Sequence, residues 1–404
     1  MRLRSASLTK AGRIGAKPAV DCNPIMETIM RTQIDADEAP SEITSPATLA
    51  GEVRGEALLA IEQQLLDLPA QLVRPLPAVK SAKSGLHLLA EDEIPEWDSL
   101  VDRSPQRSLF LKSWWLGATC GTAQVIGYFE GGRLIAGIPV FYTRRAGLRI
   151  CGMPKLTQTW GIAMQPLPGK EVTTKSRETD ILDVFAAHFA RESFFVQSFH
   201  PENQNWLPFY WKGFSQTTHY TYVLDDLTPI NRVWDGLSKD RRTNIRKARQ
   251  FGITVSECGP EPVFQMAKAA FAAQGMKCPY QMDYLNHLYE AARAKESGIC
   301  LSAIDRRGRT HAAFFFVWDG ERGYNLAGGH DPLLSASGGS VLLMWNLIEF
   351  ASAHTKAFDF AGSMRRKIEA SFRSFGGKRV GYSRIAKLPR WVRIGLSIAG
   401  IPHP

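Results

Sequence analysis

The sequence lacks the features that would mark a secreted, metal-binding or membrane-spanning protein. Its six cysteines are scattered, with no CxxC pair and no paired histidines nearby, which argues against a zinc site or a disulfide framework. No run of about 18 apolar residues occurs, so no bilayer-spanning helix is expected. The first 20 residues hold five basic and no acidic side chains but no continuous apolar segment, which argues against a secretory signal. We therefore expect a cytoplasmic protein that needs no metal.

Nucleotide-binding signatures are also missing. Neither GxGxxG nor GxxxxGK[ST] occurs, which disfavours Rossmann-type binding and nucleotide hydrolysis. Basic residues outnumber acidic ones. The resulting formal charge of +10 indicates an anionic partner such as a phosphate, coenzyme A, RNA or an anionic membrane surface. An ordinary solvated basic surface would give the same count. No RNA-binding motif is present, so we expect no specific nucleic acid, while peripheral membrane association stays open.

The chain is long enough for two domains and tails. Of its 404 residues 44% are hydrophobic and 22% charged, as in globular proteins. Residues 1–85 are rich in Ala, Pro, Ser, Thr and Glu and are predicted to be a flexible tail, with a short amphipathic helix over 52–66. The globular pattern then divides into an N-terminal lobe, a C-terminal lobe and a C-terminal tail, which we place at 86–216, 217–390 and 391–404.

Each lobe is predicted to contain a hairpin with a glycine turn. Residues 124–142 read as two strands around Gly131-Gly132, and 300–318 read as two strands around a turn at 305–308. A shift of 176 positions lays Gly132, Arg133 and Ala136 onto Gly308, Arg309 and Ala312. Such hairpins are common, but the matching context favours internal duplication. A strand at 323–326, a helix at 341–353 and a strand at 357–360 complete a mixed α/β (α+β) lobe.

A basic helix is predicted over 232–250, where seven basic residues stand against two acidic ones. Arg242, Arg246 and Arg249 are three or four positions apart and so share one face. Guanidinium groups at that spacing suit a phosphate or carboxylate, and we assign Arg242 and Arg246 to substrate binding. A solvated charged face is the alternative.

Small residues precede the apolar helix. Backbone N–H groups at a helix start can approach an anion closely where side chains are small, so Ser337, Gly338, Gly339 and Ser340 are predicted to bind the donor phosphates. The alternative is a flexible loop that only caps the helix, because such a loop would contain the same small residues. His330, at the end of the preceding strand, is a candidate general base because its reference pKa lies near neutrality.

Asp359 lies on the short strand between Phe358 and Phe360 and so points to the opposite face from both. A carboxylate there is costly to bury without partners. We predict that Asp359 is the base or the anchor of the acceptor; the alternative is that it fixes the following loop through backbone hydrogen bonds. Tyr324 is assigned to substrate binding.

Several of these runs resemble one known family. The run from Leu237 to Ala248 resembles an L-x-K-x-x-R-x-x-I-R-(K/R)-A helix of Fem-related acyltransferases of the GNAT superfamily. The segments 358–363 and 372–377 resemble the C-terminal half of that family, and 108–114 resembles its first lobe. The resemblance implies two GNAT-like lobes with a cleft between them. It also implies transfer of an acyl or aminoacyl group to an amine, often on a cell-envelope or polysaccharide-linked substrate, without a metal.

Two family features bear on whether the donor is acyl-CoA or aminoacyl-tRNA. The pyrophosphate-binding signature of GNAT enzymes, (R/Q)-x-x-G-x-(G/A), is incomplete at 335–340, because the leading Arg or Gln is missing, and this departure counts against acetyl-CoA. The paired long helices that accompany tRNA-dependent members are also not recognisable. We therefore expect acyl-CoA as the donor substrate, attacked directly by the acceptor amine. The alternatives are an aminoacyl-tRNA-dependent transferase, a non-catalytic GNAT scaffold in polysaccharide assembly, and an RNA-binding protein.

Overall fold

The computed structural model describes residues 71–72, 84–145, 148–362 and 364–389. The helix expected over 52–66, nearly all of the tail 1–85 and the C-terminal tail 391–404 lie outside the described residues. Within the described ranges no helix combines the length and hydropathy needed to cross a bilayer.

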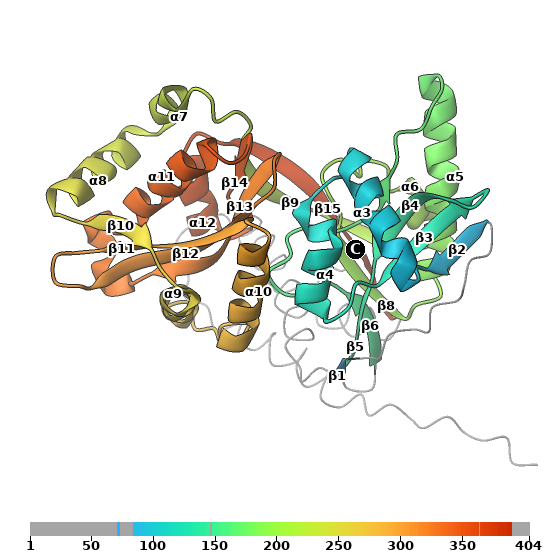
Figure 1. Cartoon of the computed structure of the whole chain (residues 1–404), viewed down its shortest axis with the longest axis horizontal. Coiled ribbons are helices and arrows are strands. Elements are labelled where there is room, and N and C mark those ends of the chain that lie inside the picture. The colour runs from blue at the N-terminus through green and yellow to red at the C-terminus, as the bar shows by residue number, and fades with distance from the viewer. Residues whose placement is uncertain (1–70, 73–83, 146–147, 363, 390–404) are drawn as a thin grey trace, which may run out of the picture.

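A large mixed sheet passes through both halves of the chain (Figure 1). In spatial order its strands are β1 (Gln71–Leu72), β5 (Phe141–Arg145), β6 (Leu148–Gly152), β8 (Phe194–Ser198), β15 (Lys378–Lys387), β9 (Ser215–Leu224), β14 (Ala357–Asp359), β13 (Arg322–His330), β12 (Thr310–Trp318), β11 (Gly298–Ile304) and β10 (Thr254–Glu257). A smaller sheet in the N-terminal half contains β2 (Gly85–Leu88), β3 (Val125–Glu130), β4 (Arg133–Pro139) and β7 (Ala163–Met164). Sheets flanked by helices make the fold a mixed α/β one, as expected.

Helices cover both faces of the large sheet in the C-terminal half. One face carries α7 (Ile230–Gly236), α8 (Lys239–Gln250) and α11 (Gly339–Ser352), and the other carries α9 (Pro260–Ala272) and α10 (Met282–Ala294) (Figure 1). In the N-terminal half the helices are α3 (Ile94–Arg103), α4 (Ser113–Cys120), α5 (Glu171–Phe189) and α6 (Leu207–Trp211), and α12 (Arg366–Arg373) precedes the last strand.

The predicted single helix over 232–250 is wrong, because the structure divides it. Leu237 has an extended backbone, and Ser238 then caps α8 by accepting a hydrogen bond from the backbone N–H of Arg241. The signal was available in the sequence, since Gly236 weakens a helix and serine favours an N-cap.

The same order of elements occurs in both halves. The hairpin β3–β4 leads through β5 to β6, which α5 connects to the parallel strand β8. The hairpin β11–β12 leads to β13, which α11 connects to the parallel strand β14. The N-terminal half departs at Val140, where the predicted strand 133–142 breaks and its two parts enter different sheets, and at β7, a short strand of the smaller sheet that lies between β6 and α5. The repeated order supports internal duplication.

The last strand ties the two halves together. β15 pairs with β9 along its length and with β8 over its final residues, so it lies between them in the sheet (Figure 1). Ile385 on β15 is fully buried in a cluster otherwise made by residues 126–214. A second cluster mixes residues of both halves, including Phe110, Trp160 and Tyr324. The division into lobes at 216/217 stays a prediction, because the halves share strands and core.

We predict that Ile385→Ala lowers the free energy of unfolding by about 2–5 kcal/mol, because it removes buried methyl groups and leaves a cavity in the N-terminal core. Val380→Ala on the same strand is the matched control, since Val380 is half-buried and lies outside the three core clusters. Urea unfolding monitored by tryptophan fluorescence measures both. Equal losses would show that β15 contributes no special packing at its C-terminal end.

Candidate functional site

Two parallel strands diverge at the centre of the C-terminal half. β13 and β14 pair only at Arg322 with Ala357, Gly323 with Phe358 and Tyr324 with Asp359. β14 then ends, while β13 continues to His330 paired with β12 alone among the described strands. In open α/β sheets, ligands bind in the crevice outside the carboxyl ends of parallel strands. Asp359 and Tyr324 stand at that position.

The Asp359 carboxylate is held by partners from three separate parts of the chain. Its Oδ1 accepts hydrogen bonds from the Thr221 hydroxyl at 2.5 Å, from the backbone N–H of Ala361 at 2.8 Å and from the side-chain amide of Gln158 at 3.3 Å. Thr221 lies on β9, and Gln158 lies in the loop between β6 and β7. The bond from Ala361 fixes the loop after β14, as the structural alternative expected. Asp359 therefore fixes the conformation of this loop and also connects the two halves of the chain through its hydrogen bond with Gln158.

The second oxygen of Asp359 is less constrained. Oδ2 lies 3.7 Å from the Arg322 guanidinium, and the carboxylate is only 1% exposed. Burial raises the pKa of Asp359 above the ordinary aspartate value, while Arg322 and the hydrogen bonds from Thr221, Ala361 and Gln158 act in the opposite direction. A carboxyl group with a raised pKa in a protein interior is a common feature of catalytic acids and bases.

Two tyrosines lie close to Asp359. Tyr324 is almost fully buried and packs against Phe110, with ring centroids 4.6 Å apart. Burial raises its pKa, so its phenol stays protonated at neutral pH. Burial, with a contribution from Asp359, raises the pKa of Tyr382 on β15 to about 12. The region around Asp359 thus offers phenol donors and one carboxylate acceptor.

The predicted donor-phosphate loop is used largely for packing. Gly338 and Gly339 are buried, and a Cβ atom on Gly338 would meet the Asn244 carbonyl oxygen of α8 at 2.6 Å. The Ser337 hydroxyl accepts the N–H of Gly339 at 3.1 Å and is 2.7 Å from His311 Nδ1. Ser340 is half-buried. Of the four predicted residues, Ser337 is the one that lines a pocket.

The other predicted site residues do not gather around Asp359. His330 is exposed at the far end of β13. The Arg242 guanidinium donates to the backbone carbonyl of Asp235 at 2.9 Å, and that of Arg246 lies 6.0 Å from the ring centre of Trp234. Their assignment to substrate stays a prediction. Arg241, which the sequence did not single out, instead joins α8 to the Ser371 and Ser374 hydroxyls near α12.

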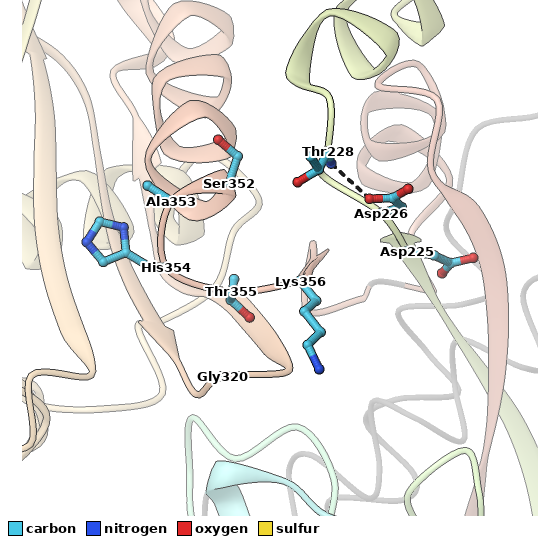
Figure 2. A pocket seen from close by; sticks show the side chains of 9 residues that line it. All are labelled: Asp225, Asp226, Thr228, Gly320, Ser352, Ala353, His354, Thr355 and Lys356. Atoms are coloured by element: carbon cyan, nitrogen blue, oxygen red, sulfur yellow. Dashed lines mark hydrogen bonds between the residues drawn. The ribbon is translucent and has the colours of Figure 1, made fainter.

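Two of the pockets on the described surface have charged side chains in their linings. The first, about 550 Å³, lies beside the end of α11 (Figure 2). Its polar side chains do not converge, since His354 points away from Lys356 and Asp225 (Figure 2). Lys356 is 2.9 Å from Glu321, and Lys378 is 2.6 Å from Asp225, so these charges are satisfied locally. The second, about 590 Å³, lies beside Ser337. Neither is lined by Asp359.

The sequence analysis did not identify the three side chains that contact the Asp359 carboxylate, namely Gln158, Thr221 and Arg322. The contacts of Thr221 and Gln158 with Asp359 span 138 and 201 positions along the chain. No local motif surrounds Gln158. Arg322 lies directly before the strand predicted over 323–326 and opens the observed strand β13, and the sequence analysis did not single it out.

We predict that Asp359→Asn leaves stability unchanged or raises it at neutral pH. A carboxyl group with a raised folded pKa stabilises the fold below its unfolded pKa of about 3.9, and this contribution is lost as the pH rises through the folded pKa. The neutral amide of the variant does not ionise and so does not lose this stability. The difference in free energy of unfolding between the variant and the parent protein should therefore shrink as the pH falls towards about 4. Chemical unfolding at a series of pH values tests this. An advantage that grows with acid would contradict the raised pKa.

Comparison with known proteins identifies the C-terminal half. Residues 238–366 match the acetyltransferase (GNAT) domain family. The crystal structure of FemX matches with a TM-score of 0.55 and 10% identity, covering 76% of this chain and 99% of that one. The C-terminal domain of a putative lysylphosphatidylglycerol synthetase from Agrobacterium fabrum gives a TM-score of 0.45 at 12% identity, over 77% and 96% of the two chains. No curated protein matches the chain in sequence. The chain therefore contains an acetyltransferase (GNAT) domain at 238–366, and its fold resembles that of FemX.

Proposed function

We propose that this protein transfers an acyl group from acyl-CoA to an amine, with Asp359 receiving the proton that the amine loses. The observation that carries the proposal is the position of Asp359. It is a buried carboxylate with a raised pKa, at the carboxyl end of the parallel pair β13–β14, inside the GNAT domain.

The contact with Gln158 supports an amine as the acceptor. The Gln158 side-chain amide donates to Asp359 Oδ1 over 3.3 Å, the longest of the three hydrogen bonds to that oxygen. An acceptor amine donates an N–H to the same kind of acceptor. Gln158 is only half-buried, so an amine that displaces its amide would reach Asp359 from the side of the N-terminal half.

The open edge of β13 supports a donor with a long arm. From Asn325 to His330 the strand extends about 17 Å, at about 3.3 Å per residue, and β14 does not pair with this stretch. The edge leads from Asp359 towards the segment that enters α11. Acyl-CoA has a long arm between its thioester and its phosphates, and Ser337 with the α11 N-terminus stands at the phosphate end of this route. Arg242, Arg246 and Tyr324 remain proposed substrate contacts.

The reaction needs no covalent intermediate on the protein. The amine nitrogen attacks the thioester carbon, the C–N bond forms, the C–S bond breaks, and the CoA thiolate leaves. The amine proton passes to Asp359, and the neutral Tyr324 phenol is a hydrogen-bond donor for developing negative charge. We propose an envelope- or polysaccharide-related amine as acceptor because the Fem-like resemblance implies one. Five free cysteines among the described residues fit a cytoplasmic setting.

We predict that Asp359→Asn lowers kcat by about 100-fold or more while acyl-CoA still raises the melting temperature, because the change removes the base and spares the donor site. CoA-thiol release is measured with acetyl-CoA and longer acyl-CoAs in the presence of amino-sugar and amino-acid acceptors. Because burial raises the Asp359 pKa, the acid limb of kcat should lie above the ordinary aspartate value.

Asp226→Asn is the matched control, since this exposed carboxylate accepts the Thr228 N–H, is not a hydrogen-bond partner of Asp359 and should change kcat less than about twofold. Unchanged turnover in Asp359→Asn would remove Asp359 from the mechanism. If the protein transfers an aminoacyl group from aminoacyl-tRNA and no group from any acyl-CoA, the donor is aminoacyl-tRNA and the acyl-CoA proposal is wrong. Absence of transfer from both, with no thermal shift, would favour a scaffold.

A further inference from the structure

The second pocket lies on the opposite end of the β12–β13 hairpin from Asp359. It has a volume of about 590 Å³ and is formed by the end of α8, the turn between β11 and β12, and the 3-10 helix η3 (Pro332–Ser337). Pockets of a few hundred cubic ångströms are of the size that holds a small ligand. No motif predicted from the sequence includes the turn at 305–309 as a site.

The pocket carries an excess of positive charge. Four cationic side chains line it, Lys247, Arg306, Arg307 and Arg309, against the single carboxylate of Asp305. Asp305 is already engaged, since it accepts from the Arg309 guanidinium at 2.8 Å and from the backbone N–H of Arg307 at 2.9 Å. In the described part of the chain no carboxylate forms an ion pair with Lys247, Arg306 or Arg307. Three cations thus remain for an external anion.

Arg306 is positioned by a glycine. Gly252, directly after α8, has φ +73°, and a Cβ atom there would lie 2.4 Å from Arg306 Nε. The absent side chain leaves room for the Arg306 side chain against the backbone at the end of α8. The last turn of a helix carries partial negative charge, which favours a cation there. This brings Arg306 from the turn into the same pocket as Lys247 from the helix.

The rim of the pocket is apolar and exposed. Phe251 is 59% exposed and Leu333 is 92% exposed, which is unusual for large hydrophobic side chains. Lys247 lies 5.6 Å from the ring centre of Phe251. Cations grouped beside an uncovered aromatic ring suit a ligand that carries both phosphates and a planar base, since bases stack on aromatic side chains and guanidinium groups bind phosphates. A purely inorganic anion would leave the apolar rim unused.

We propose that this pocket is a nucleotide site, in which Arg306, Arg307 and Lys247 bind the phosphates and Phe251 stacks on the base. If the nucleotide is the terminal part of CoA, the site rests on the proposed function and extends its donor contacts; if the nucleotide is a separate ligand, the site goes beyond that function. Ser337, at the inner wall, connects the pocket to the start of α11 through its hydrogen bond with Gly339.

Calorimetric titration of the full chain with CoA, adenosine 3′,5′-bisphosphate, UDP and inorganic pyrophosphate tests the proposal. At least one nucleotide should bind, and Arg306→Ala/Arg307→Ala should weaken it at least tenfold. Phe251→Ala should weaken the nucleotide while leaving pyrophosphate affinity unchanged. All three residues are exposed, so these variants are expected to fold. Arg133→Ala/Arg232→Ala removes the same charge from exposed positions outside the pocket and should leave affinity within twofold.

The source of the nucleotide follows from the same titrations. Binding of CoA and the 3′,5′-bisphosphate in preference to UDP indicates the donor, and the reverse preference indicates a separate nucleotide. Failure of every nucleotide to bind, or equal weakening by the control pair, would overturn the site. Binding of anionic phosphatidylglycerol vesicles with no nucleotide binding would overturn it in favour of a membrane surface. These outcomes are read without turnover, so they are independent of the Asp359 proposal.

Discussion

The burial of one carboxylate, Asp359, constrains the centre of this protein. A carboxylate with 1% exposure is stable only when hydrogen bonds and an opposite charge replace its water. Those partners come from β9, from the loop before β7 and from β13, so strands and loops distant in sequence must meet at one point. The net effect still leaves the pKa raised, which means that this environment favours the protonated form more than water does. If this site served stability alone, a neutral residue in place of Asp359 would give a higher free energy of unfolding at neutral pH.

The shared sheet explains how that point is held rigidly. Because β15 lies between β8 and β9, the two halves cannot separate without breaking a ladder of backbone hydrogen bonds. Ile385 adds apolar packing in the N-terminal core, and Tyr324 packs on Phe110 across the same junction. Gln158 can therefore be held near Asp359 by the frame, although its own hydrogen bond is the longest of the three to Oδ1.

The sequence predicts what is local and periodic. The hairpins around Gly131-Gly132 and at 305–308, the helix α11 and the strand with Asp359 all appear within a few residues of their predicted places, because alternation and glycine turns are short-range signals. Thr221 and Gln158 could not be predicted as partners of Asp359, since pairing across more than 100 positions is decided by tertiary packing. Among the described strands, β13 pairs with β12 alone beyond Tyr324, and this depends on where β14 ends, which one sequence does not determine.

The glycines before α11 show how one pattern can serve two purposes. A glycine at 338, with φ +77°, lets the α8 backbone approach within a distance that any side chain would block. Read as a phosphate loop, the same glycine would instead let an anion approach. In the structure the close approach of α8 brings Lys247 and Phe251 into the lining of the pocket that Ser337 also lines, so helix packing helps to form this basic pocket. The positive charge of this pocket therefore comes from side chains that the packing of α8 brings together, while the assignment of Ser337, Gly338, Gly339 and Ser340 to the donor phosphates stays a prediction.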